Sequence, residues 1–355
     1  MTNWMLGQTY KKSSMQRVLH GGKKWVPSAM HGLALAFISM VAATLWAAKI
    51  HPERRKFELK AESAAFWKLV SPDATLETLA SGLGFTEGPV WDPAGFVYVS
   101  DEELNKIFRI YMDGRREELI SLGDPDGNTY DSQHQLLDCA SYLRAIIRIS
   151  PTGKIEVLAD KFEGKRFNSP NDVVMGPDGA IYFTDPTLDL PKGEKKELPY
   201  QGVYRLDSKG QVTLLTSELS QPNGLAFSQD GTRLYVDDSE KRNIRVYDFR
   251  PGGTLENGRI FGEEPGNKGE GVPDGMKVDL AGNLFVTGPG GIWVWDASGR
   301  HLGTILLPEQ PANLAWGDAD LGTLYITATT SVYRLKTNTR GFVPYLVDKS
   351  DSNGK

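Results

Sequence analysis

A repeat of short strands and turns most constrains the fold of this chain. From residue 74 onward, an apolar strand, a turn of the D-x-x-G type and a second apolar strand recur at intervals of roughly 40 to 50 residues. Six units follow one another: EGPVWDPAGFVYVSD, DGNTYDSQHQLLDCA, NDVVMGPDGAIYFTD, NGLAFSQDGTRLYVDD, DGMKVDLAGNLFVTG and ANLAWGDADLGTLYIT. A further strand pair follows each unit, and almost no helical periodicity interrupts the pattern.

Units of four strands with this period predict an all-β fold, a six-bladed β-propeller. We place the propeller over residues 74–345 and a C-terminal tail over 346–355. The segment ATLETLASGL, residues 74–83, precedes the first unit, and we expect it to add the outer strand of the last blade and so close the ring. Residues 49–73 are then expected to form a linker.

The N-terminal 48 residues have a different character. A basic leader, residues 1–31, precedes an uncharged apolar run at 32–48 (GLALAFISMVAATLWAA). This run is at the short limit for a membrane-spanning helix and slightly long for the core of a signal peptide. Three alternatives stay open: an uncleaved signal anchor that forms a single-pass membrane anchor, a cleaved signal peptide, and a buried helix. The first two predict a propeller that is exported to the periplasm or the cell exterior, either anchored or free.

Composition excludes some classes of partner. The net charge is -5, so no basic excess indicates nucleic acid as a ligand. Cys139 is the only cysteine, which rules out an intrachain disulfide and says little about the compartment.

One position repeats in register through the six units. It is occupied in turn by Glu87, Asp126, Asn171, Asn223, Asp274 and Ala312. The first strand of a propeller blade is innermost, so these positions should meet at one mouth of the central channel. Turn preference accounts for Asn and Asp but not for Glu. The alternative is a set of strand-start residues that hydrogen-bond neighbouring blades.

Converging carboxylate and amide oxygens predict a site for one divalent cation. Ca²⁺ suits such hard donors best, and Mg²⁺, Mn²⁺ and Zn²⁺ are alternatives. The register contains no His or Cys, which argues against a zinc site of the nitrogen and sulfur type. Asp126 lies in the plain turn GDPDGN and is the weakest member of the set.

The loops between second and third strands should share the face of this mouth. For the longest of them, residues 186–201, two alternatives stay open: a cover over the substrate and a solvated surface loop. Nearby polar residues are candidate substrate contacts: Arg166, Asn168 and Tyr200. For Asn168 a hydrogen bond between blades is the favoured alternative. The same geometry places His134 and His301 on the opposite face, so neither is expected to act as a base.

Four stretches together resemble the senescence marker protein (regucalcin)/gluconolactonase/luciferin-regenerating-enzyme-like family of six-bladed propellers. They are EGPVWDPAGFVYVSD, RFNSPNDVVMGPDGAIYFTDP, QPNGLAFSQDGTRLYVDDS and VPDGMKVD, and the resemblance spans about residues 75 to 345. It implies one divalent cation in the channel and hydrolysis of lactones or related esters. The residues that it places around the cation are Glu87, Asn171, Asn223 and Asp274.

The resemblance also assigns roles and shows two departures. It implies that Asp274 is the catalytic acid/base and that Asn171 contacts the substrate as well as the cation. Asp126, a further candidate substrate contact, stands where the family often has Asn. Cys139-Ala140 stands where many bacterial relatives have a Glu-His pair. The substrate edge of blade two is therefore expected to differ from that of its relatives.

Three functions are compatible with this site. The first is a metal-dependent lactonase for a small sugar lactone, in which the cation polarises the carbonyl and Asp274 takes a proton from water. The second is an arylesterase or organophosphate hydrolase on the same scaffold. The third is a non-enzymatic propeller that binds a ligand and keeps a structural metal. The fold does not choose among them, but the intact oxygen set favours the first.

Overall fold

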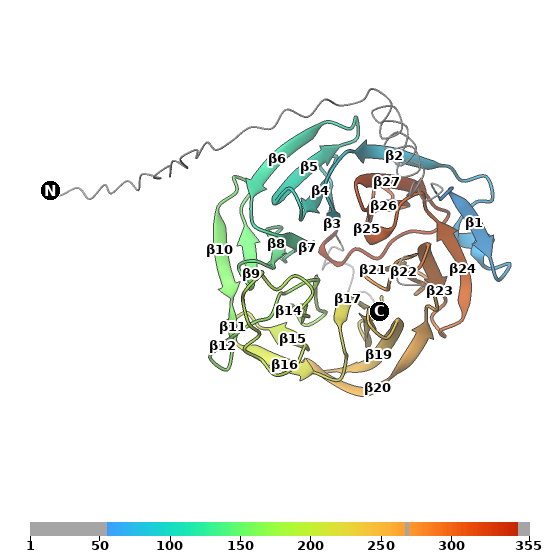
Figure 1. Cartoon of the computed structure of the whole chain (residues 1–355). Helices are drawn as coiled ribbons and strands as arrows, with labels where there is room; N and C mark the ends of the chain where they lie inside the picture. The colour runs from blue at the N-terminus through green and yellow to red at the C-terminus, as the bar shows by residue number, and fades with distance from the viewer. Residues whose placement is uncertain (1–54, 267–269, 347–355) are drawn as a thin grey trace, which may run out of the picture. The chain divides into compact units, whose positions relative to one another are not determined.

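The structure, a computed structural model, describes residues 55–266 and 270–346. Six antiparallel sheets, each with at least four strands, are arranged around a common axis (Figure 1). The predicted six-bladed β-propeller is therefore confirmed. The predicted leader and the apolar run at 32–48 lie outside the described residues.

The first three blades follow one another along the chain, each from its inner to its outer strand. Blade one contains β3 (Thr86–Asp92), β4 (Phe96–Asp101), β5 (Lys106–Tyr111) and β6 (Arg116–Ser121). Blade two contains β7 (Pro125–Tyr130), β8 (Leu136–Ala140), β9 (Ala145–Ile149) and β10 (Ile155–Ala159). A short hairpin of β11 (Lys161–Phe162) and β12 (Lys165–Arg166) leads to blade three, which contains β13 (Val173–Met175), β14 (Ile181–Asp185), β15 (Gly202–Leu206) and β16 (Val212–Thr216).

The remaining blades complete the ring. Blade four contains β17 (Pro222–Phe227), β18 (Arg233–Asp238), β19 (Asn243–Arg250) and β20 (Thr254–Glu263). Blade five contains β21 (Met276–Val278), β22 (Leu284–Gly288), β23 (Gly291–Trp295) and β24 (His301–Leu306). Blade six contains β25 (Pro311–Gly317), β26 (Thr323–Ala328) and β27 (Ser331–Lys336), followed by the 3-10 turn η2 (Pro344–Leu346).

The ring closes through a strand from the start of the propeller. Strand β2 (Leu76–Ser81) pairs antiparallel with β27, with Leu76 opposite Leu335 and Ser81 opposite Ser331. This is the segment expected to close the ring, and Figure 1 shows it outside β27. Joining the two ends of the chain into one sheet leaves the last blade with a full set of strands.

The stretch expected to be a linker is partly structured. Strand β1 (Glu58–Ala61) pairs with β24 and adds a fifth strand to blade five. Helix α2 (Phe66–Leu69) follows, and its Phe66 is fully buried in the apolar cluster between blades five and six. The linker expectation for residues 49–73 is therefore wrong for 58–69, because an exposed sheet edge and an apolar surface were available to bind these residues.

Burial explains why the inner strands read as apolar runs. All six residues of β4 are buried, because each blade lies between two others. The outer strands β6 and β10 instead contain only exposed and half-buried residues. Each fully buried Val, Leu, Ile or Phe side chain contributes about 1.5–3 kcal/mol, so the interfaces between blades supply most of the stabilisation.

The repeated D-x-x-G turn has a simple physical basis. In blade one the Asp92 carboxylate accepts a hydrogen bond from the N–H of Ala94 at 2.7 Å, and the N–H of Gly95 bonds to the Asp92 carbonyl oxygen at 2.9 Å. Gly95 has a φ of 92°, a conformation that side chains disfavour. The turn therefore sets the register of the strands beside it.

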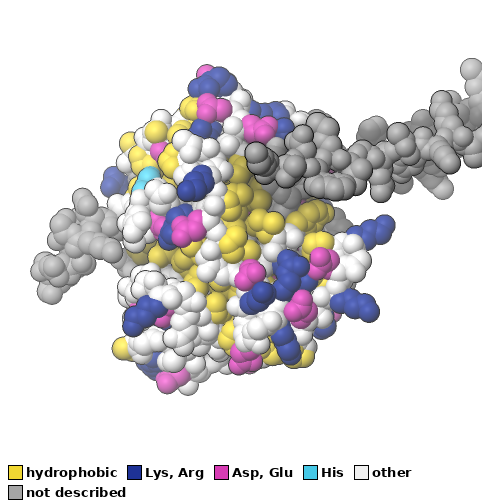
Figure 2. Space-filling view, turned by 90° about the vertical axis from the view of Figure 1, so that its left-hand side faces the viewer, with side chains coloured by type: hydrophobic (Ala, Val, Ile, Leu, Met, Phe, Trp, Pro, Cys, Tyr) yellow, Lys and Arg dark blue, Asp and Glu magenta, His cyan; other side chains and the backbone are white. Residues whose placement is uncertain are grey.

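The outside of the ring carries charges of both signs. Figure 2 shows Lys and Arg side chains among Asp and Glu side chains, around a band of hydrophobic ones. Among the helices within the described ranges, none is long and apolar enough to cross a membrane.

Candidate active site

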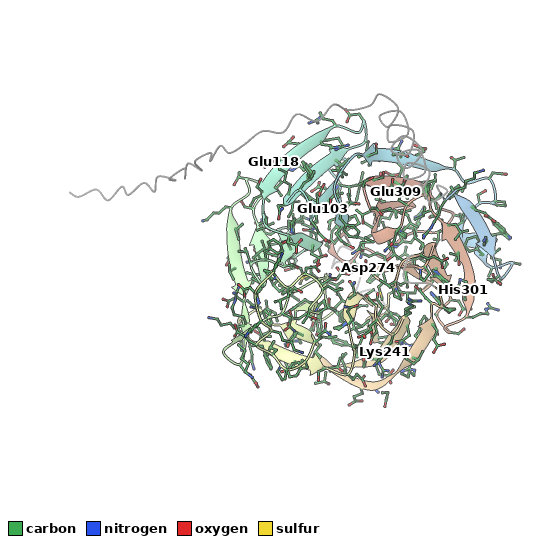
Figure 3. The ribbon with its side chains drawn as sticks, in the orientation of Figure 1. Glu103, Glu118, Lys241, Asp274, His301 and Glu309 are labelled. Carbon is green, nitrogen blue, oxygen red and sulfur yellow. The ribbon has the colours of Figure 1, made fainter. Side chains whose placement is uncertain are left out.

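Four of the residues singled out by the repeat line one pocket at a mouth of the channel. Glu87, Asn171, Asn223 and Asp274 come from four different blades and border a space of about 350 Å³. Figure 3 shows Asp274 near the centre of the ring. The inner strands contact one another in order around the axis, so residues at their starts are brought together. The structure thus brings these four together as the register predicts.

Glu87 is held by one oxygen and presents the other. Its Oε2 accepts hydrogen bonds from the N–H of Gly88 and from Nδ2 of Asn313, the latter at 2.9 Å. Its Oε1 is buried and accepts no hydrogen bond from the described residues. A buried carboxylate oxygen without a partner is costly when it is ionised, and a bound cation would remove that cost.

Asp126 lies beside Asn171 and does not line the pocket. Its Oδ2 accepts a hydrogen bond from Nδ2 of Asn171 at 2.8 Å, and its Oδ1 has no partner within the described part of the chain. Because a carboxylate accepts and the amide nitrogen donates, Oδ1 of Asn171 is turned away from Asp126. Asp126 therefore contacts one of the four pocket residues and fixes the orientation of its amide.

The pocket is strongly acidic. Burial, aided by Asp172, raises the pKa of Glu87 to about 7. Burial also raises the pKa of Asp274 well above its usual range, and the charges of Glu87 and Asp172 add to the effect. These carboxyl groups repel one another when ionised, and a positive charge at the centre of the pocket would relieve that repulsion.

Three further carboxylates line the same pocket. Glu102 and Glu103 come from the loop between β4 and β5, and Asp189 comes from the loop between β14 and β15. Burial raises the pKa of Asp189 to about 6, and it raises that of Glu102 as well. Figure 3 shows Glu103 on the side of blade one. Loops between second and third strands were expected at this mouth, which pointed to residues 186–201. The same expectation applies to the loop that contains Glu102 and Glu103.

The loop at 186–201 borders the pocket and is held in place. Its Leu188 and Asp189 line the pocket. Behind it the buried guanidinium of Arg144 donates to the carbonyl oxygen of Phe167 at 2.6 Å and forms an ion pair with Glu194 at 2.6 Å. Since this guanidinium is almost completely buried, it anchors the loop against blade two.

Other candidate contacts lie away from the pocket lining. Arg166 donates to the carbonyl oxygen of Leu143 at 2.9 Å and pairs with Glu194, and Tyr200 packs against the core of blade three. Asn168 donates to the carbonyl oxygens of Asp185 and Tyr200, both at 3.1 Å. These side-chain hydrogen bonds lie within blade three, so they serve the fold but are not the hydrogen bond between blades that was the favoured alternative.

Neither described histidine faces the pocket, and one edge of blade two is apolar. His134 stacks on Tyr130 in the turn between β7 and β8, while His301 begins β24 and stacks on Trp293. Both positions are on the opposite side, as predicted. Cys139 and Ala140 at the end of β8 are fully buried. A base in this pocket must accordingly be a carboxylate, so far as the described residues are concerned.

The donor set fits a hard divalent cation. Two carboxylates and two amides converge, and Oε1 of Glu87 has no other partner among the described residues. Within residues 55–266 and 270–346, no three His, Cys, Asp or Glu side chains are grouped as a metal site. Of the four expected residues, only Glu87 and Asp274 belong to these residue types. The other two, Asn171 and Asn223, would supply amide oxygens.

Comparisons with known proteins agree with the fold. A family model described as the SMP-30/Gluconolactonase/LRE-like region matches residues 85–330. A gluconolactonase of Zymomonas mobilis is 37% identical over 300 residues, which cover 75% of this chain and 82% of that protein. The diisopropyl-fluorophosphatase of Loligo vulgaris is 26% identical over 222 residues, covering 56% and 70% of the two chains.

A solved structure has a similar fold. The structure of a gluconolactonase from Xanthomonas campestris matches with a TM-score of 0.73 and 33% sequence identity. The match covers 79% of this chain and 94% of that one.

Proposed function

Since this chain belongs to the SMP-30/gluconolactonase/LRE-like family, we propose that it is a cation-dependent hydrolase that opens an uncharged sugar lactone. The observation that supports this most directly is the convergence of Glu87, Asn171, Asn223 and Asp274 on one pocket. A propeller that only binds a ligand has no need of so many carboxylates facing one space.

In this proposal the four residues hold one divalent cation, with Ca²⁺ as the favoured ion. Glu87 Oε1 and the amide oxygens of Asn171 and Asn223 are the hard donors that such an ion prefers. When bound, the cation supplies Lewis-acid polarisation of the lactone carbonyl and favours the ionised form of the carboxylates around it.

Asp274 is the general base in the proposed reaction. It takes a proton from the attacking water while the water oxygen bonds to the acyl carbon. The bond between that carbon and the ring oxygen then breaks, and Asp274 returns the proton to the ring oxygen. The product is the open-chain hydroxy acid. Asn171 lines the same pocket as Asp274 and is the proposed contact for the substrate.

The charge of the pocket favours a neutral substrate. Five carboxylates line it, namely Glu87, Glu102, Glu103, Asp189 and Asp274, and the lining within the described residues contains no Lys, Arg or His. One divalent cation balances the charges of Glu87 and Asp274 only, so any ionised fraction of the other three carboxyl groups leaves the pocket negative and would repel a phosphorylated or acidic lactone. The same repulsion acts on the carboxylate product and favours its release.

A lactone panel tests this function. We would strip the full-length protein of metal and follow hydrolysis of gluconolactone, pentonolactones and 6-phosphogluconolactone while titrating Ca²⁺, Mg²⁺, Mn²⁺ and Zn²⁺. We expect one cation to restore turnover of the neutral lactones, and we expect Asp274→Asn and Glu87→Gln to reduce that turnover at least about 100-fold. Asp160→Asn, at a half-exposed side chain outside the pocket lining, is the matched control and should keep full activity.

The second candidate is a phosphotriester or aryl ester hydrolase. The similarity to a diisopropyl-fluorophosphatase favours keeping it in the same panel. Turnover of diisopropyl fluorophosphate or an aryl ester without turnover of any lactone would replace our proposal with this one. Cation binding without hydrolysis of any of these compounds would favour a binding propeller with a structural metal.

We also propose that the propeller is exported, on the basis of the apolar run at residues 32–48. Alkaline phosphatase fused after residue 53, just before the described propeller, would test this. An active fusion supports export, and an inactive one places the propeller inside the cell.

A further inference from the structure

A lysine and an asparagine lie next to Glu87 on the inner strands of blades five and six. Lys277 of β21 donates from Nζ to Oδ1 of Asn313 at 3.2 Å and to the carbonyl oxygen of Met276 at 3.0 Å. Asn313 of β25 is buried and donates from Nδ2 to Oε2 of Glu87 at 2.9 Å. The three side chains thus form a chain of hydrogen bonds that ends on a pocket carboxylate.

The orientation of the Asn313 amide is determined by its neighbours. Its Oδ1 accepts from two groups that can only donate, the ammonium of Lys277 and the N–H of Leu314 at 2.9 Å. The amide nitrogen must therefore face Glu87, whose carboxylate accepts. Without the lysine, only the N–H of Leu314 would hold this orientation of the amide, and the donor to Oε2 of Glu87 would be less firmly fixed.

Close packing restricts the Asn313 side chain further. A Cβ atom added at Gly275 would lie 2.1 Å from both Cγ and Oδ1 of Asn313. The side chain therefore lies directly against the backbone of the residue that follows Asp274. A glycine at position 275 is needed for this approach, and it leaves Asn313 little room to move.

We propose that Lys277 and Asn313 are positioning residues for Glu87. They engage Oε2 so that Oε1, which has no hydrogen bond from the described residues, is presented to the pocket. Neither residue lines the pocket. The inference rests on the proposed cation site, because a presented oxygen matters only if a ligand binds it. Groups that orient the ligands of a metal commonly change its affinity by about 10 to 100-fold.

Calorimetric titration of the metal-free, full-length protein with Ca²⁺ tests the inference. We expect Lys277→Met and Asn313→Ala to raise the dissociation constant for Ca²⁺ by about 10 to 100-fold. Two matched controls are available away from the pocket. Lys336→Met removes an exposed lysine paired with Asp320, and Asn283→Ala removes a buried amide that donates to Asp279 at 2.8 Å. Both controls should keep the wild-type affinity.

A double-mutant cycle separates positioning from a general structural role. In a Glu87→Gln background, Lys277→Met should change the affinity for Ca²⁺ little further, because both substitutions act through the same carboxylate. A wild-type affinity in the folded Lys277→Met and Asn313→Ala proteins, or losses that add in full, would overturn the inference while leaving the cation site intact. If the wild-type protein itself binds no Ca²⁺ or other divalent cation, the proposed function fails, and the inference fails with it.

Discussion

The cost of ionising Glu87 predicts how the stability of the metal-free protein depends on pH. Burial and the charge of Asp172 raise the pKa of Glu87 from 4.5 to about 7 in the folded protein. The side chain is almost completely buried, so solvent screens these effects little. At about 1.4 kcal/mol for each pH unit, the difference corresponds to about 3 kcal/mol of unfolding free energy.

The sign follows from which state binds the proton. Between pH 4.5 and about 7 the folded protein keeps a proton on Glu87 that the unfolded chain has released. Stability must therefore fall as the pH rises through this window, and the loss is complete above it. The Glu87→Gln variant has no such proton, so it should lack this part of the loss. For a propeller of this size, about 3 kcal/mol corresponds to roughly 5 °C in melting temperature.

Thermal unfolding followed by circular dichroism at pH 5 and pH 8, with a chelator present, measures the effect. The wild-type melting temperature should fall between the two pH values by roughly 5 °C more than that of Glu87→Gln. Buried carboxyl groups whose pKa does not depend on Glu87, such as Asp185, whose pKa burial raises to about 8, titrate in both proteins and cancel in the comparison. Glu156→Gln on the outer strand β10 is the control. Equal decreases in wild type and Glu87→Gln would refute the reasoning.

Three further changes test other parts of the structure. Phe66→Ala should lower the unfolding free energy by about 3–5 kcal/mol, because it leaves a cavity between blades five and six. Denaturant titration measures this, and a change below about 1 kcal/mol would restore the linker expectation. Gly224→Ala should lower the melting temperature, since its Cβ would lie 1.8 Å from the carbonyl oxygen of Asp274, and an unchanged value would contradict this packing. Asp274→Asn should reduce kcat on a neutral lactone about 10² to 10⁴-fold without loss of folding, and activity within a factor of three would remove Asp274 from its role.

The fold could be predicted from the sequence because each blade repeats the same pattern of apolar strands and hydrogen-bonded turns. The turn at Asp92–Gly95 fixes its own geometry through contacts between near neighbours, and equivalent turns recur along the chain. Once the repeat is aligned, the ring brings Glu87, Asn171, Asn223 and Asp274 to one mouth without knowledge of any long-range contact. Their roles as cation ligands remain predictions.

Contacts between distant positions could not be predicted in the same way. Asn313 contacts Glu87 across 226 residues of sequence and stands one position after Ala312, the register residue that has no oxygen donor. The alignment therefore passed over the residue of blade six that reaches the site. The pairing of β1 with β24 was missed for a related reason, since the four residues of β1 show no pattern that distinguishes a strand from a linker.

Ionised carboxylates in the empty pocket lower the stability of the fold, and a bound cation would offset this loss. The interfaces between blades must offset the unfavourable ionisation of Glu87 and Asp274, whose pKa values burial raises. A cation present at a hundred times its dissociation constant stabilises a folded protein by about 2.7 kcal/mol. That is close to the cost of ionising Glu87 alone, about 3 kcal/mol. Saturation with cation should then remove most of the difference between wild type and Glu87→Gln at pH 8, because the same carboxylate oxygen that destabilises the empty pocket contributes to holding the ion.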